Sequence, residues 1–156
     1  MNPEEVKLLI LDVDGVLTDG RLYLSEGGSE TKCFHVHDGQ GLVLLYDAGV
    51  QIAVISARES EAIRPRLQEL KIKEAILGCD DKYAEACAVV ERVGCRWEEV
   101  VCMGDDVTDV PLLEAAGMGV AVADARPQAR EAADWITPSP GGRGAVRDVC
   151  DWILKR

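Results

Sequence analysis

The 156-residue sequence has no long hydrophobic run, no closely paired cysteines and no excess of positive charge. Its apolar runs, such as residues 6–13, are much shorter than the roughly 20 apolar residues that cross a bilayer. Residues 1–5 are acidic, whereas the start of a secretory signal peptide is basic. We therefore expect a cytoplasmic protein with no membrane-spanning segment and no membrane partner.

The cysteine spacing argues against a zinc-binding or disulfide-rich protein, and the net charge argues against a nucleic-acid-binding protein. The six cysteines contain no Cys-x-x-Cys pair, so neither a zinc site nor a disulfide framework is predicted. The formal net charge of -11 would repel a phosphate backbone, which argues against a nucleic-acid partner. An anionic small molecule would need a local cation in order to bind.

The residues that are present indicate one globular unit. Hydrophobic residues make up 47% of the chain and charged residues 29%, a balance that excludes disorder. The length suits a single domain over residues 1–156.

Strand-like and helix-like segments alternate along most of the chain. Strands are predicted over residues 7–13, 51–56, 75–78, 100–103 and 119–123, and helices over residues 38–47, 59–70, 80–93, 111–116, 127–133 and 145–155. Asp38 is predicted to cap the first helix and Gly49 to end it, while Pro65 delays the regular part of the second. Because each crossover is helix-sized, this alternation predicts an α/β fold with a doubly wound, mainly parallel, Rossmann-like sheet.

Residues 20–37 depart from this alternation. Gly27-Gly28 separates two short segments, residues 21–26 and 29–37, and both glycines tolerate the positive φ of a tight turn. We predict a small antiparallel β-hairpin here that acts as a flap.

Polar side chains lie at the ends of three predicted strands, and one more lies near the start of a predicted helix. Asp12 and Asp14 follow the first strand, Ser56 ends the second, Asp105 follows the strand over 100–103, and Lys82 lies near a helix start. Ligands of such sheets bind at the carboxyl ends of the strands. Three carboxylates from two strand ends suit Mg²⁺, a hard cation that takes oxygen ligands.

These residue types suit phosphoryl transfer. Asp12 can attack phosphorus and form an aspartyl phosphate, and Asp14 can protonate the leaving alkoxide and then deprotonate water. Lys82 and Ser56 supply an ammonium and a hydroxyl donor for the charge that spreads over the phosphoryl oxygens. Magnesium would offset the repulsion between an anionic nucleophile and an anionic ester.

The order and spacing of four segments resemble the motifs of the haloacid dehalogenase superfamily: residues 12–18, Ser56, Lys82 and residues 104–109. Three more segments narrow the resemblance to phosphatases similar to 3-deoxy-D-manno-octulosonate 8-phosphate phosphatase, which act in lipopolysaccharide sugar synthesis. These segments are residues 38–42, 121–127 and 141–147.

The resemblance implies a role for each acidic residue. Asp12 matches the nucleophile and Asp14 the acid/base. Magnesium is held in the family by side chains that match Asp12 and Asp105 and by the carbonyl that matches Asp14. Asp106 and Asp109 are expected to orient metal-bound water and neighbouring ligands.

The resemblance also implies an assembly. Members without a large cap domain form tetramers in which the hairpin of one subunit covers the active site of another, so we expect a homotetramer and no large cap.

The glycine-rich residues 141–144 are expected to reach the substrate. Candidate substrate-binding residues are Thr18, Arg58, Glu59, Arg66, Gly142 and Arg143, although each arginine can equally pair with an acidic side chain. His35 and His37 are interpreted as surface residues of a strand and not as site residues.

One departure from the family leaves the substrate open. The second motif usually continues as Gly-Arg, whereas this chain has Ala57-Arg58-Glu59 after Ser56. Relatives that act on nine-carbon sugar acids, such as 2-keto-3-deoxynononate 9-phosphate, resemble this feature. The sequence favours the eight-carbon substrate and keeps the nine-carbon one as the alternative.

Two hypotheses from other functional classes, a signalling domain and a non-catalytic assembly domain, are less favoured. A phosphoacceptor signalling domain also has an acidic magnesium site, but its paired acids follow the first strand and its acceptor follows a later one. A non-catalytic assembly domain is disfavoured because every motif carboxylate and Lys82 are present.

Overall fold

A fully apolar strand forms the centre of the structure, a computed structural model that describes residues 1–155. All four residues of β1 (Leu8–Leu11) are buried. This strand pairs in parallel with β4 (Gln51–Ser56) on one side and with β6 (Val100–Gly104) on the other. A parallel strand that is covered on both faces needs apolar side chains at every position, and the sequence provides them.

Within residues 1–155, six parallel strands form one sheet in the order β5-β4-β1-β6-β7-β8. The outer strands are β5 (Glu74–Leu77), β7 (Met118–Ala121) and β8 (Trp135–Ile136). The predicted doubly wound parallel sheet is confirmed. Strand β8 was not predicted because a strand of two residues is too short to show the alternation of apolar and polar side chains that marks a strand in a sequence.

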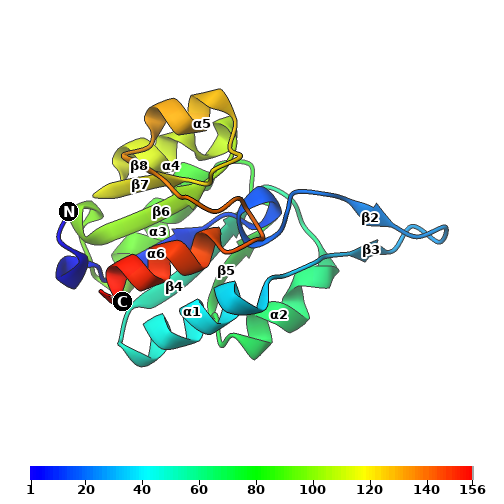
Figure 1. The fold of residues 1–156 in the computed structure, drawn as a ribbon, viewed down its shortest axis with the longest axis horizontal. Coiled ribbons are helices and arrows are strands. Elements are labelled where there is room, and N and C mark those ends of the chain that lie inside the picture. The colour runs from blue at the N-terminus through cyan, green and yellow to red at the C-terminus, as the bar shows by residue number, and fades with distance from the viewer. Residues whose placement is uncertain (156) are drawn as a thin grey trace.

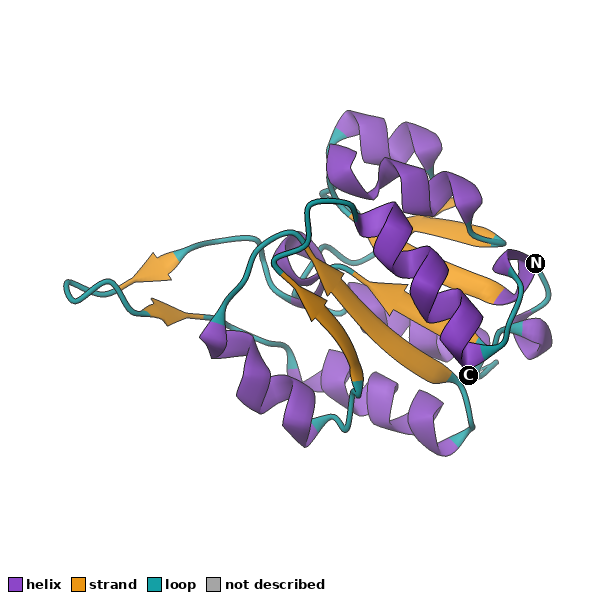
Figure 2. Ribbon diagram, turned by 180° about the vertical axis from the view of Figure 1, so that it is seen from behind, coloured by secondary structure: helices purple, strands orange, loops and turns teal. Residues whose placement is uncertain are grey.

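Helices cover both faces of the sheet (Figure 1 and Figure 2). On one face, α1 (Val36–Asp47) packs against α6 (Ala145–Ile153). On the other, α3 (Lys82–Val93) packs against α4 (Val110–Ala115). This two-sided covering buries the apolar strands and leaves the strand ends accessible, as in other doubly wound folds.

Two shorter helices complete the crossovers. Helix α2 (Arg64–Glu69) follows a 3-10 turn at Glu61–Ile63, and Pro65 lies in its first turn. The predicted late start of this helix is confirmed. Helix α5 (Pro127–Ala132) packs beside α4. None of the helices that residues 1–155 form has both the length and the apolar character needed to cross a bilayer.

The prediction that Asp38 caps α1 is wrong. The helix begins earlier, at Val36, and His35 occupies the cap position without a side-chain hydrogen bond. Asp38 lies buried in the first turn, where its carboxylate accepts hydrogen bonds from the N–H groups of Gly144 at 3.3 Å and Arg147 at 2.8 Å. It therefore satisfies the free N–H groups at the start of α6 and joins the two helices.

The predicted hairpin is present but shorter than predicted. Strands β2 (Tyr23–Leu24) and β3 (Glu30–Thr31) pair antiparallel and project from the main sheet (Figure 1). Gly28 has the positive φ that the turn requires. The prediction of a strand to residue 37 is wrong because His37 belongs to α1. In the part of the chain that the structure describes, no large cap covers the sheet edge.

Candidate active site

A buried lysine joins two carboxylates at the carboxyl edge of the sheet. Asp12 follows β1, and Lys82 is the first residue of α3, whose start is capped by the Asp81 side chain. Lys82 Nζ donates hydrogen bonds to Asp12 Oδ1 at 2.7 Å and to Asp109 Oδ1 at 2.6 Å. All three side chains are at least nine-tenths buried, so water screens these contacts weakly.

The loop after β6 is held by Asp109. Its second oxygen accepts hydrogen bonds from the N–H groups of Asp105 at 2.9 Å and Asp106 at 3.3 Å. A Cβ at Gly104 would overlap the Asp109 side chain, so glycine permits this close approach. Asp106 is exposed and caps the following turn through Val107 N–H. Asp109 thus positions both the acidic loop and Lys82.

Three carboxylates form a cluster suited to a cation. One oxygen each from Asp12, Asp105 and Asp109 lies within 4.8 Å of the others. Gly15 has φ +94, and a Cβ there would overlap the Asp105 carboxylate. An all-oxygen, carboxylate donor set of this kind fits Mg²⁺.

The electrostatics of the cluster favour the same conclusion. Burial and the neighbouring carboxylates, chiefly Asp12, raise the pKa of Asp105 to about 8. Burial and the Asp109 charge also raise the pKa of Asp12 to about 6, although Lys82 opposes this. Burial would lower the pKa of Lys82, but Asp12 and Asp109 raise it, so its ammonium stays charged. A divalent cation would relieve the repulsion that one ammonium leaves uncompensated.

The Asp14 carboxylate lies outside this cluster. Its Oδ1 accepts a hydrogen bond from Lys32 Nζ at 2.5 Å and its Oδ2 accepts one from Arg58 Nη1 at 3.1 Å. Lys32 follows β3 of the hairpin, and Arg58 follows β4. The Asp14 side chain is therefore placed apart from the three clustered carboxylates.

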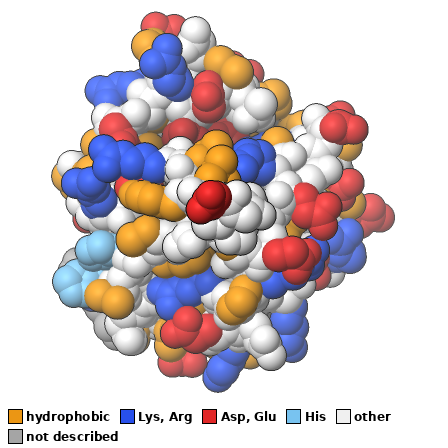
Figure 3. All heavy atoms as spheres, turned by 90° about the vertical axis from the view of Figure 1, so that its right-hand side faces the viewer, with side chains coloured by type: hydrophobic (Ala, Val, Ile, Leu, Met, Phe, Trp, Pro, Cys, Tyr) orange, Lys and Arg blue, Asp and Glu red, His pale blue; other side chains and the backbone are white. Residues whose placement is uncertain are grey.

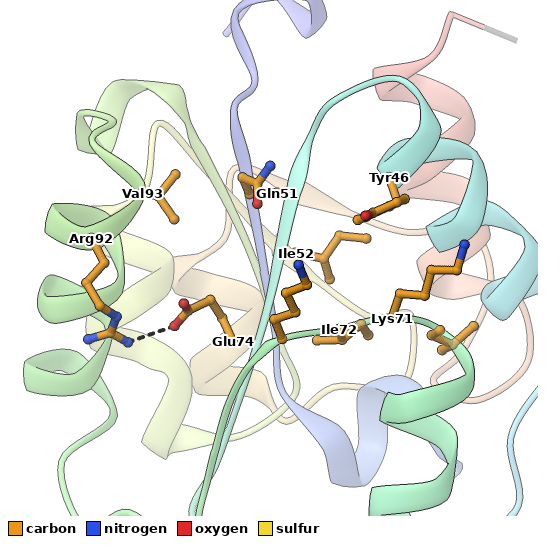
Figure 4. Close-up of a pocket in the computed structure, with 10 residues that line it drawn as sticks. Tyr46, Gln51, Ile52, Lys71, Ile72, Glu74, Arg92 and Val93 are labelled. Carbon is orange, nitrogen blue, oxygen red and sulfur yellow. Dashed lines mark hydrogen bonds and ion pairs between the residues drawn. The ribbon is translucent and has the colours of Figure 1, made fainter.

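One cavity of about 260 Å³ collects most of these residues. It is lined by Asp12, Asp14, Gly20, Ser56, Ala57, Arg58, Lys82, Asp105, Asp106 and Thr108. A second cavity, of about 450 Å³, lies at the opposite edge of the sheet, near the starts of β4 and β5 (Figure 4). Its lining includes Tyr46, Lys71 and an ion pair between Arg92 and Glu74, and none of the motif residues reaches it.

Comparison with known proteins identifies the family. The sequence profile of haloacid dehalogenase-like hydrolases matches residues 80–148. The 3-deoxy-D-manno-octulosonate 8-phosphate phosphatase KdsC of Escherichia coli (strain K12) is 40% identical over 151 residues, which are 97% of this chain and 80% of that protein. The chain belongs to this phosphatase family.

Two solved structures of the family share its fold. The phosphatase from Moraxella catarrhalis, solved with a magnesium ion, a phosphate ion and a KDO molecule, matches with a TM-score of 0.95 and 38% identity. That match covers 98% of this chain and 88% of the other. The cobalt-bound phosphatase from Haemophilus influenzae matches with a TM-score of 0.95 and 40% identity, covering 99% of this chain and 91% of the other.

Several residues that the family resemblance suggested for substrate binding lie outside the cavity lining. These are Thr18, Glu59, Arg66, Gly142 and Arg143. Thr18 Oγ1 accepts hydrogen bonds from the N–H groups of Gly15 and Gly20, so it holds the loop after β1. Arg66 pairs with Glu69 on α2, and Glu59 pairs with Arg64. Arg58 is the one member of the suggested set that lines the cavity.

Sequence reasoning missed Lys32, which contacts Asp14. The hairpin was predicted as a flap, but no residue on it was predicted to belong to the phosphatase site. A lysine inside a polar, strand-like segment has the same pattern as a solvated surface lysine. Only the fold, which brings the end of β3 beside the loop after β1, shows this contact.

Proposed function

We propose that this family member is a magnesium-dependent phosphatase that hydrolyses 3-deoxy-D-manno-octulosonate 8-phosphate through an aspartyl-phosphate intermediate. The observation that carries the proposal is the position of Asp12. Its carboxylate lies 2.7 Å from a buried ammonium, within 4.8 Å of two further carboxylates, and on the wall of the cavity. Membership of the family supports the choice of substrate.

Magnesium, bound by the side chains of Asp12 and Asp105 and the carbonyl of Asp14, would polarise a phosphoryl oxygen. In the first step, an Asp12 oxygen bonds to phosphorus, the bond to the sugar oxygen breaks, and Asp14 gives that oxygen its proton. In the second step, Asp14 takes a proton from water as the water oxygen attacks phosphorus. The bond to Asp12 then breaks, which releases inorganic phosphate and restores the Asp12 carboxylate and the protonated Asp14.

The remaining residues stabilise charge and hold geometry. Ser56 and Lys82 line the cavity and would donate to the phosphoryl oxygens, where negative charge gathers in the transition state. Asp109 fixes the Lys82 ammonium at 2.6 Å, and we propose that Asp106 contacts metal-bound water. Of the suggested substrate-binding residues, Arg58 is 44% exposed and lines the cavity, which supports a contact with the sugar carboxylate.

The deciding experiment is turnover of a panel of sugar-acid phosphates with and without a chelator. We expect release of phosphate from 3-deoxy-D-manno-octulosonate 8-phosphate, loss of that release with chelator, and recovery with Mg²⁺. The nine-carbon 2-keto-3-deoxynononate 9-phosphate belongs in the panel because Glu59 and Ala57 depart from the usual second motif. Faster turnover of the nine-carbon ester would reassign the substrate, and chelator-resistant turnover would reject the magnesium mechanism.

We also propose that residues 1–156 act as one domain within a homotetramer. The hairpin exposes Leu22 at 53% and Leu24 at 65%, and such side chains commonly become buried in assemblies. Figure 3 looks onto the end of the molecule from which the hairpin projects and shows hydrophobic side chains there among charged ones. Light scattering after size-exclusion chromatography measures the subunit count.

We further propose a cytoplasmic location. The described residues contain six free cysteines, and cysteines stay reduced in the cytosol.

A further inference from the structure

The hairpin delivers a buried ammonium to the proposed acid/base. The Lys32 side chain is only 2% exposed, and its Nζ lies 2.5 Å from Asp14 Oδ1 and 3.4 Å from Glu30 Oε1. Burying a lysine is costly unless a carboxylate compensates its charge. The short contact therefore fixes both partners, and it constrains one oxygen of Asp14 much more tightly than a solvated ion pair would.

Glu30, the second carboxylate that contacts Lys32, is itself fixed by contacts with the loop after β4. Glu30 Oε2 accepts a hydrogen bond from Ser60 Oγ at 2.5 Å, and Glu30 Oε1 accepts one from Arg58 Nη2 at 3.1 Å. These contacts attach the base of the hairpin to the loop that carries the second motif. The two cations and two carboxylates balance in charge, so the charge of the buried Lys32 ammonium is compensated.

The two oxygens of Asp14 differ in their surroundings. Oδ1 is held by the buried Lys32, whereas Oδ2 is held by Arg58, which is 44% exposed and lines the cavity. An arriving substrate can displace the exposed partner more easily than the buried one. Oδ2 is therefore the oxygen available to the leaving group and to water.

We propose that Lys32 is a positioning residue for the acid/base step: it holds Asp14 Oδ1 and thereby directs Oδ2 to the leaving oxygen. This inference rests on the proposed function. Once the substrate has displaced Arg58 and Oδ2 carries a proton, Asp14 gives that proton to the leaving oxygen as the bond from phosphorus to that oxygen breaks, and Asp14 becomes a carboxylate. The Lys32 ammonium stabilises the charge that Asp14 gains in this step.

A series of substituted phenyl phosphates tests the proposal, because these esters share their shape but differ in the basicity of the leaving oxygen. The measured quantity is kcat/KM, which reports the steps up to departure of the leaving group. Basic leaving groups depend most on a proton donor. We expect Lys32→Met to make the plot of log kcat/KM against leaving-group pKa steeper, with a loss on the order of 10–100-fold at the basic end. The ester with the least basic leaving group should lose much less.

Parallel plots for wild type and Lys32→Met would overturn the proposal, because a structural or substrate-binding role lowers all esters equally. Lys32→Arg keeps the charge and should restore the wild-type slope. Lys32→Gln serves as a second variant if the methionine protein fails to fold, and folding is checked by the melting temperature. Lys73→Met is the matched control, since Lys73 is exposed and lines only the cavity at the opposite edge and a neighbouring groove. A wild-type protein that hydrolyses no phosphate ester would instead reject the proposed function.

Discussion

Lys82 Nζ lies 2.7 Å from Asp12 Oδ1, although 70 residues separate the two side chains in sequence. The sheet order places the end of β1 beside the ends of β4 and β6, and the crossover from β5 returns through α3, so the first residue of α3 reaches this edge. The ammonium fixes one oxygen of the carboxylate and favours its ionised form. A carboxylate in this state is ready to act as a nucleophile.

Asp12→Asn should abolish turnover, with a loss of about a thousandfold or more in kcat, because an amide is a poor nucleophile. The measurement is phosphate release under saturating substrate, together with a test for labelled protein after acid quenching. Asp47→Asn is the matched control, since Asp47 is exposed at the end of α1. Full activity of Asp12→Asn would reject the covalent mechanism.

Asp105→Asn should stabilise the metal-free protein and remove the response to Mg²⁺. Burial and the neighbouring carboxylates raise the pKa of Asp105 to about 8, so its ionised form opposes folding at neutral pH. We expect a gain in the free energy of unfolding on the order of 1–2 kcal/mol without metal, allowing for screening by water. With Mg²⁺ at 100 times its Kd, wild type should gain about 2.7 kcal/mol.

Urea denaturation with chelator and with Mg²⁺ measures both effects of Asp105→Asn. The amide lacks the charge that holds a hard cation, so its unfolding midpoint should hardly respond to Mg²⁺. An equal response of the variant and wild type would show that Asp105 does not hold the ion.

The motif residues could be predicted because the carboxyl ends of neighbouring parallel strands meet at one edge. Asp12, Ser56 and Asp105 each end or follow a strand whose apolar run is clear in the sequence, and the structure gathers them around one cavity. Lys32 and Asp38 had no such pattern. Each is placed by contacts between segments far apart in sequence, Lys32 with Asp14 and Asp38 with the start of α6. Local periodicity carries no information about such contacts.

Asp38→Ala should destabilise the protein by about 2 kcal/mol, because it leaves two N–H groups at the start of α6 without an acceptor. The measurement is the urea midpoint with its slope, at constant pH. Asp38→Asn retains one acceptor oxygen and should lose less. A loss no larger than that of an exposed substitution would show that solvent can satisfy Gly144 and Arg147.

Glu99→Gln should destabilise the protein at neutral pH and lose this effect in acid. Glu99 Oε1 lies 2.8 Å from Lys7 Nζ, and Oε2 accepts a hydrogen bond from Arg96 N–H at 2.9 Å. These contacts, first that with Lys7, lower the pKa of Glu99 to about 2. The unfolded chain binds the proton more tightly than the folded one, so the stabilisation is complete above pH 4.5 and declines as the pH falls toward 2.

Melting temperatures of wild type and Glu99→Gln between about pH 7 and pH 3 measure this decline. The difference between the two proteins should be clearly smaller at the acidic end. Lys7 precedes β1 and Glu99 precedes β6, so the ion pair connects the starts of two central strands. Its loss should therefore lower the melting temperature of the whole protein. Glu98→Gln, the same change at the exposed neighbouring position, is the matched control. A difference for Glu99→Gln that stays constant with pH would mean that its cost comes from altered packing and not from the charge.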